Sequence, residues 1–154
     1  MTAGELRRRL ALRAARRGDV AEVVAKLQQK GYLDDRRFAE TFARLRVENQ
    51  GFGKFRVLRD LKGRRVPAVL AQAAVTQAYR EVDENQLIEQ YIERKLRPRI
   101  TKEADVSYSR LASFYRALLR AGFSSDRIRE SLRKLSVPSE WVDGLESLEE
   151  EVSD

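Results

Sequence analysis

The stretch GYLDDRRFAETFARLRVENQGFGKFR, residues 31–56, predicts two helices joined by a glycine-rich turn. Gly31 can stop a preceding helix in the left-handed conformation that glycine favours, and the side chain of Asp34 can cap the next helix. That helix is expected to run to about Gln50, where Gly51-Phe52-Gly53 ends it. Its apolar face, at helical spacing, would comprise Phe38, Ala39, Phe42 and Leu45.

Two helices are also expected before this stretch. Thr2 and Glu5 form a capping-box pattern for a helix that runs to about Arg17. Gly18 would break that helix, and Asp19 would cap the next one. The apolar stripes of these helices would be Leu6, Leu10 and Ala14 in the first, and Val20, Val23, Val24 and Leu27 in the second.

Helix signals continue after the stretch, and strand signals do not occur, so the predicted fold class is all-α. One helix is expected to carry Phe55, Leu58 and Leu61, and two more should begin after Pro67 and after Asp83. A longer helix should start near Glu103, and the last two should follow Gly122-Phe123-Ser124 and Pro138. The helix after Pro67 would bury Val69, Leu70 and Ala73. The acidic tail from Glu146 to Asp154 is expected to fray.

The composition excludes several classes of site. The 154 residues include no cysteine and no histidine, which rules out Cys/His zinc sites, disulfides, cysteine nucleophiles and histidine-based triads. Apolar runs are too short to span a bilayer, and the N-terminus lacks the apolar core of a signal peptide. A cytoplasmic location without membrane association is therefore expected.

Charge is distributed unevenly along the chain. Residues 1–80 hold 19 Lys/Arg and 8 Asp/Glu, a net charge of +11, whereas residues 81–154 hold 12 and 16, a net charge of −4. A basic half predicts a polyanionic partner, which could be nucleic acid or an acidic protein surface. A solvated, Arg-rich helical surface is the plain alternative.

Groups that could carry chemistry are few. Asp34-Asp35 is a paired carboxylate, but adjacent helical residues point about 100° apart, so capping is the better explanation than a metal-dependent nuclease. Gly51-Phe52-Gly53-Lys54 could cradle a phosphate, but it lacks the full nucleotide-loop pattern. A flexible joint that directs Lys54 and Arg56 outward is favoured there. We expect a protein that is not an enzyme and has no cofactor or metal.

Candidate partner-binding residues come from the basic clusters around residues 31–65. They are Arg36, Arg37, Arg44, Arg46, Lys54, Arg56, Arg59, Lys62, Arg64 and Arg65. They could contact phosphates or the acidic loops of a protein. The aromatic residues among them are expected in the core, except Phe52, which lies between two glycines and could stack on a base or enter a partner pocket.

The sequence also contains a weak internal repeat. Helix–turn–helix patterns occur around Gly18, around Arg64-Arg65-Val66 and around Gly122-Phe123, about 50 residues apart. Each unit would comprise about three helices. The predicted boundaries are a partial unit at 1–30, full units at 31–81 and 82–137, and a short helix with the acidic tail at 138–154.

Residues 31–39, GYLDDRRFA, resemble the signature G-Y-L-D-D-x-R-F-A of the RecX family. Arg44 and Arg46, the pattern Gly51-x-Gly53-x-x-Arg56 and the pair Asp60-Leu61 follow as they do in that family. Residues 118–124 are similar to its turn L-x-x-R-G-F-S, and residues 5–10 to its E-L-R-x-K-L. The motif residues expected to be structural are Gly31, Tyr32, Leu33, Asp34, Asp35, Phe38, Ala39, Gly51 and Gly53.

The resemblance implies tandem three-helix repeats in an elongated, curved arrangement. It also implies a monomeric protein that binds the RecA recombinase, above all its filament on single-stranded DNA. Such a protein would modulate, and usually inhibit, filament growth, ATP turnover and strand exchange by occupying a surface. A stand-alone protein that binds single- or double-stranded DNA is the alternative. A third possibility, a nuclease that depends on acidic residues, would need several carboxylates that converge on one site.

Departures from the family pattern lead to three further expectations. The family has another helix before the one that starts here near Thr2, so the first repeat would be incomplete. Arg65 stands where the family's turn has glycine, so this turn would close differently and the basic patch would grow. Residues 97–103 are more polar than the family pattern.

Overall fold

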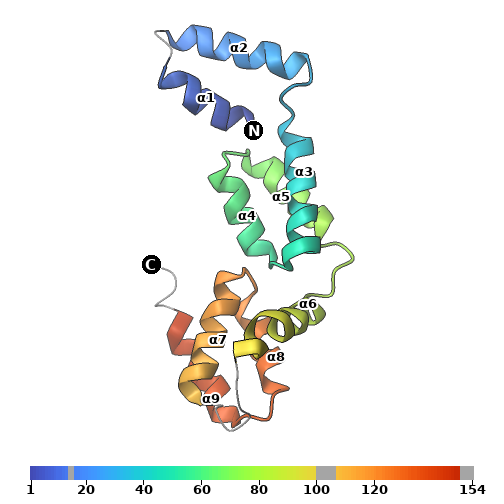
Figure 1. The fold of residues 1–154 in the computed structure, drawn as a ribbon, viewed down its shortest axis with the longest axis vertical. Helices are drawn as coiled ribbons and strands as arrows, with labels where there is room; N and C mark the ends of the chain where they lie inside the picture. Colours follow the sequence, from blue (N-terminus) through green and yellow to red (C-terminus); the bar gives the residue numbers. More distant parts are fainter. Residues whose placement is uncertain (14–15, 100–106, 150–154) are drawn as a thin grey trace. The chain divides into compact units, whose positions relative to one another are not determined.

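The computed structural model describes residues 1–13, 16–99 and 107–149 (Figure 1). All regular structure in these residues is helical, which confirms the predicted all-α class. The α-helices are α1 (Ala3–Ala11), α2 (Arg17–Gln29), α3 (Asp35–Leu45), α4 (Lys54–Gly63), α5 (Ala68–Ala78), α6 (Glu84–Tyr91), α7 (Tyr108–Arg120), α8 (Ser125–Arg133) and α9 (Ser139–Asp143). Short π and 3-10 turns extend three of them, at Arg46–Gln50, at Ile92–Leu96 with Arg97–Arg99, and at Gly144–Leu148.

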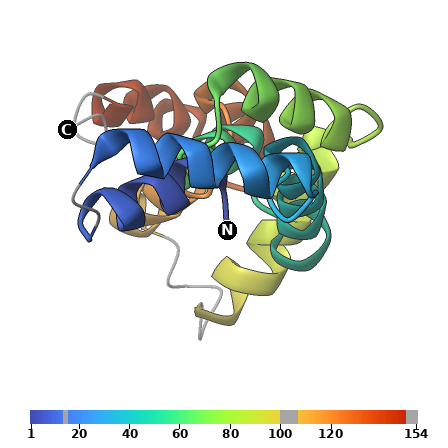
Figure 2. The same cartoon turned by 90° about the horizontal axis from the view of Figure 1, so that it is seen from above.

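The chain divides into two compact units. The first unit comprises Met1–Glu48 and Val57–Arg80, and the second comprises Asn49–Arg56 and the described residues of Glu81–Asp154. The division falls within α4, whose first turn belongs to the second unit. Within the first unit, α1 and α2 form a helical hairpin that is visible in both views (Figures 1 and 2), and α3 packs along α5.

Three predicted helix starts are confirmed. Thr2 and Glu5 form the full capping box, in which Thr2 Oγ1 accepts from the Glu5 amide at 3.1 Å and Glu5 Oε2 accepts from the Thr2 amide at 3.0 Å. Asp34 accepts from the Arg37 amide at 3.0 Å, and Asp83 accepts from the Asn85 amide at 3.0 Å. Each cap satisfies amides that a helix N-terminus otherwise leaves unpaired.

The predicted break between the first two helices is wrong. α1 ends at Ala11, and α2 begins at Arg17, so Gly18 and Asp19 lie inside its first turn. Glycine costs little there because first-turn amides have no partner within the helix, and the Asp19 carboxylate favours the positive end of the helix dipole. Ala14, predicted on the first stripe, lies outside the described residues.

Several predicted faces are rotated about the helix axis. α3 buries Ala39 and Ala43 completely, whereas Leu45 is 42% exposed. Phe38 and Phe42 on the same helix are half-buried. α5 buries Ala71, Ala74 and Val75 instead of the predicted Val69, Leu70 and Ala73, and Val69 is 78% exposed. Small residues on both helices let their backbones approach closely, and this packing decides the inner face. Val23 and Phe55, also predicted inside, are exposed.

The C-terminal predictions are partly wrong. α7 begins at Tyr108, where the Ser107 side chain accepts from the Arg110 amide at 3.2 Å; the predicted start near Glu103 lies outside the described residues, as do most of the polar residues 97–103. Residues 144–149 do not fray, because Leu145 is fully buried. Residues 150–154 lie outside the described part of the chain.

Two of the three turns compared in the sequence close in the same way. Arg65 and Gly122 both have positive φ angles, +58° and +96°. The amides of Arg65 and Val66 donate to the carbonyls of Lys62 and Leu61 at 2.9 and 3.1 Å, and the amides of Gly122 and Phe123 donate to Leu119 and Leu118 at 3.0 and 3.3 Å. This is the Schellman pattern, in which the residue after the cap is left-handed. Arg65 therefore closes the turn as glycine does, contrary to the expectation of a different turn.

Arg65→Gly is expected to raise the free energy of unfolding by about 0.5–1 kcal/mol. Arginine is strained in the left-handed conformation, whereas glycine is not. Part of this gain is lost because glycine increases the conformational entropy of the unfolded chain. Urea denaturation followed by circular dichroism measures the change. Lys62→Gly, one turn earlier inside α4, should change stability in the opposite direction. A lower free energy of unfolding in Arg65→Gly would show that the positive φ angle of Arg65 is not a source of strain.

Candidate functional site

The ten basic candidates are divided between the two units. Lys54 and Arg56 belong to the second unit, and the other eight belong to the first. Arg36 pairs with Glu40 at 3.1 Å and Arg44 with Glu48 at 3.8 Å, both as exposed pairs along α3. Such pairs contribute little to stability, but they partly neutralise the charge that the sequence assigned to partner binding.

Family-motif residues line an open groove along α3. The groove, which we call the α3 groove, has a volume of about 400 Å³ and is lined by Met1, Gly31, Tyr32, Asp34, Arg37, Phe38, Thr41, Phe42 and Leu45. Tyr32 is 77% exposed, so its predicted place in the core is wrong. The rings of Phe38 and Phe42 stack with centroids 5.8 Å apart, and the Arg46 guanidinium lies 4.7 Å from the Phe42 ring. Because Ala39 and Ala43 turn inward, the aromatic residues of α3 remain partly open to solvent.

Both carboxylates of the Asp34-Asp35 pair serve backbone capping. Asp34 caps α3, as predicted, and Asp35 Oδ1 accepts from the Ala3 amide at 2.8 Å. Asp35 therefore also satisfies the start of α1, a long-range contact that local sequence patterns do not reveal. Neither oxygen pair converges with further acids, and the described residues contain no group of three or more acids that could hold a metal ion.

The Gly51-Phe52-Gly53 segment is hydrogen-bonded to the turn that follows α7. The Gly53 amide donates to the Ala121 carbonyl at 2.7 Å, and the Phe55 amide donates to the Gly122 carbonyl at 3.1 Å. Two motifs nearly 70 residues apart in the sequence thus meet backbone to backbone: Gly53 is 68 residues before Ala121. Because the Gly53 amide is already bonded, it does not contribute to the phosphate cradle that the glycine-rich alternative required.

Phe52 and Arg56 cover each other. The Arg56 guanidinium lies 3.9 Å from the centroid of the Phe52 ring, and both side chains are half-buried. Phe52 is therefore not the exposed aromatic that its position between two glycines suggested, and Arg56 packs against the protein itself. Lys54 is exposed, with its ammonium group 5.5 Å from the exposed Phe55 ring. Of these two cations, only Lys54 is directed outward as predicted.

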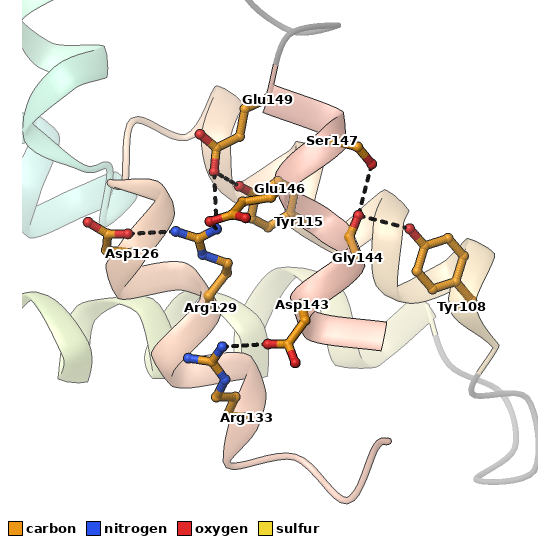
Figure 3. A network of polar contacts seen from close by, with 10 residues as sticks. All are labelled: Tyr108, Tyr115, Asp126, Arg129, Arg133, Asp143, Gly144, Glu146, Ser147 and Glu149. Atoms are coloured by element: carbon orange, nitrogen blue, oxygen red, sulfur yellow. Dashed lines mark hydrogen bonds and ion pairs between the residues drawn. The ribbon is translucent and has the colours of Figure 1, made fainter. Parts of the chain in front are cut away.

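A polar network holds residues 143–149 against α7 and α8 (Figure 3). Arg129 lies at its centre, 2.6 Å from Asp126, 2.6 Å from Glu146 and 3.7 Å from Glu149. The Tyr115 hydroxyl donates to Glu149 at 2.7 Å. Burial, reinforced by the bond to Glu149, raises the pKa of the Tyr115 hydroxyl well above its usual value. Because these acids surround one arginine, Glu146 and Glu149 of the acidic tail are engaged within their own unit, and the network has a structural role.

The sequence has relatives among known proteins. A family model described as "RecX, second three-helix domain" matches residues 34–75, which cover most of α3–α5. The chain is 34% identical over 128 residues to Regulatory protein RecX of Halorhodospira halophila, and the aligned region covers 80% of this chain and 74% of that protein. It is 29% identical over 134 residues to the protein of the same name from Trichlorobacter lovleyi, with 86% and 85% covered. The corresponding protein of Legionella pneumophila is 28% identical over 117 residues, with 76% and 73% covered.

No solved structure matches the chain significantly. Within the described residues, no helix has both the length and the apolar character needed to cross a membrane. The family model covers Gly53 and most of the residues that line the α3 groove, from Asp34 to Leu45. The chain belongs to the RecX family of regulatory proteins.

Proposed function

We propose that this protein regulates the RecA recombinase by binding its filament on single-stranded DNA. It inhibits filament growth, ATP hydrolysis and strand exchange by occupying a filament surface, and performs no chemistry. The observation that carries this proposal is the α3 groove, because five residues of the family signature line it: Gly31, Tyr32, Asp34, Arg37 and Phe38.

The side chains of the α3 groove suit a protein partner. Tyrosine, phenylalanine and arginine are enriched at protein interfaces, where a few such anchors supply most of the binding energy. Tyr32 is largely exposed, and Phe38 and Phe42 present a stacked pair beside Arg46. Contiguous exposed apolar surface on a folded protein commonly marks an interaction site. The signature residues would therefore contact the partner as well as build the helix start.

Basic residues would assist this contact by electrostatic steering. The net charge of +11 over residues 1–80 attracts the polyanionic filament and raises the association rate. Arg36, Arg37 and Arg59 of the first unit and Lys54 of the second are exposed and could take part. We further propose that the protein acts as a monomer built of repeats at 31–81 and 82–137, with part of a repeat at 1–30 and a short helix and acidic tail at 138–154.

A stand-alone nucleic-acid-binding protein is the second candidate, because the basic half alone would suffice for it. The two candidates differ in what they need. The first requires RecA and an intact α3 groove, whereas the second requires only cations.

The test measures RecA ATPase on single-stranded DNA with this protein at substoichiometric levels. The wild-type protein should lower the rate, and Tyr32→Ala should need at least about tenfold more protein for the same inhibition, since it removes an interface anchor. Val69→Ala is the matched control, because Val69 is as exposed as Tyr32 in the same unit but does not line the groove. It should inhibit as the wild type does.

Two outcomes would count against the proposal. No effect of the wild-type protein on the ATPase, together with tight binding to DNA without RecA, would favour the stand-alone candidate. Equal inhibition by wild type and Tyr32→Ala would remove the α3 groove from the contact.

A further inference from the structure

A second groove in the first unit lies between α1 and the end of α4. It has a volume of about 310 Å³ and is lined by Glu5, Arg8, Arg9, Leu12, Gly63 and Arg65. Glu5, Arg8 and Arg9 of α1 and its C-cap Leu12 fall at i, i+3, i+4 and i+7, so one face of the helix forms one wall. We call this the α1 groove; it shares no lining residue with the α3 groove.

The charge of the α1 groove is strongly positive. Its one carboxylate, Glu5, is already committed, because one oxygen accepts from the Thr2 amide at 3.0 Å and the other pairs with Arg64 at 3.3 Å. Burial alone would raise the pKa of Glu5, but these bonds hold it below its usual value, so Glu5 stays ionised and bound. Within the described part of the chain, no carboxylate pairs with Arg8, Arg9 or Arg65.

The surrounding sequence adds to this charge. Between Leu6 and Gly18 the chain has six arginines and no acidic residue. This differs from α3, where Arg36 and Arg44 each have a glutamate one turn away. Arg8 and Arg9 lie in the last turn of α1, and Arg65 follows the end of α4, so two negative helix ends help to hold three guanidinium groups together. The helix dipoles favour positive charge at these two ends but leave the net charge of the groove uncompensated.

The composition of the α1 groove distinguishes it from a protein interface. Its cations are all arginines, whose planar forks match the oxygens of a phosphate in pairs. Its one large apolar residue, Leu12, is 81% exposed at the edge and does not form a pocket. A protein interface is usually built around buried aromatic or apolar anchors, as the α3 groove could be. A chain of phosphodiesters requires cations and no such anchor.

We propose that the α1 groove binds the phosphodiester backbone of a nucleic-acid strand through Arg8, Arg9 and Arg65. The binding is sequence-independent and does not require RecA, so it is separate from the proposed inhibition through the α3 groove. In a filament it would give the protein a second contact, made to DNA instead of protein.

The test uses the full chain and a fluorescently labelled oligothymidylate, with anisotropy measured over a series of NaCl concentrations and no RecA present. The variant carries Arg8→Gln, Arg9→Gln and Arg65→Asn, because asparagine tolerates the left-handed conformation. We expect at least about a tenfold loss of affinity at low salt. The slope of log K against log salt should fall in magnitude by about 2, since each single-strand phosphate contact contributes about 0.7.

The matched control removes three charges from exposed ion pairs: Lys26→Gln, Arg97→Gln and Arg133→Gln. It has the same net charge as the variant, and it should keep the wild-type slope. Circular dichroism melts of both proteins verify folding. An unchanged slope in the variant, or an equal loss in the control, would overturn the proposal. So would a variant that keeps oligothymidylate binding but loses binding to RecA without DNA, because the groove would then be a protein contact.

Discussion

Gly122→Ala is expected to lower the free energy of unfolding by about 3 kcal/mol or more. A Cβ at this position would lie 2.3 Å from the Arg56 amide nitrogen and 2.7 Å from the Gly53 carbonyl oxygen. These are backbone atoms, which cannot rotate away as the end of a side chain can. The φ angle of +96° adds a second cost, since alanine is strained there. Backbone strain and overpacking each typically cost about 1–3 kcal/mol.

The measurement is urea denaturation followed by the fluorescence of Trp141, the single tryptophan, which lies in the second unit beside Tyr108. Gly63→Ala is the control, because a Cβ there meets nothing within 4 Å and alanine favours the helix by up to about 1 kcal/mol. Gly53→Ala should be nearly as harmful as Gly122→Ala, since its Cβ would lie 2.3 Å from the Gly122 carbonyl. The double variant should cost less than the sum, because both changes break one contact. If Gly122→Ala proved as harmless as Gly63→Ala, the close approach would be refuted.

Arg129→Gln is expected to lower the free energy of unfolding by about 2 kcal/mol. The Arg129 side chain is only 13% exposed and contacts three carboxylates, which would repel one another without it. The cost is held below that of a buried ion pair because two of the carboxylates, Asp126 and Glu146, are largely in water. The loss should also weaken the bond from Tyr115 to Glu149, and with it the attachment of residues 144–149.

Arg133→Gln provides the matched comparison, one turn further along α8. Arg133 pairs with Asp143 at 2.7 Å, a distance like those at Arg129, but both side chains are more than half exposed. Its loss should cost less than about 0.5 kcal/mol. Denaturation in urea at low and high salt separates the two, since the Arg129 effect should persist in salt and the Arg133 effect should not. Equal costs for both variants would mean that burial does not distinguish them.

Local signals in the sequence were sufficient for much of the fold. Thr2, Asp34 and Asp83 cap helices because a cap depends on residues two or three positions away, and Gly31 stops α2 for the same local reason. The inner faces were harder to predict. On α5 the large residues Val69 and Leu70 looked like the buried face. Instead α5 buries Ala71, Ala74 and Val75, and α3, which packs along it, buries Ala39 and Ala43.

The candidate site shows the same limit. Tyr32 and Phe52 were assigned by their neighbours in the chain, and both assignments reversed in the structure, because exposure depends on what packs against a side chain. No local pattern predicts that Gly53 meets Gly122, or that Asp35 reaches the amide of Ala3. The α1 groove also joins residues more than 50 positions apart, so the sequence showed its arginines without their convergence.

Neither unit is a single run of chain, and this imposes an order on synthesis at the ribosome. The first unit is complete once residue 80 has emerged, and it can then bury its core. Residues 49–56 emerge before that point, but Ala121 and Gly122, which bind Gly53 and Phe55, are translated some 65 residues later. Until then the amides of Gly53 and Phe55 lack the carbonyl groups to which they donate in the folded protein. A nascent chain halted between residues 80 and 120 should therefore carry a protease-sensitive segment at Gly51-Phe52-Gly53 that the finished protein protects.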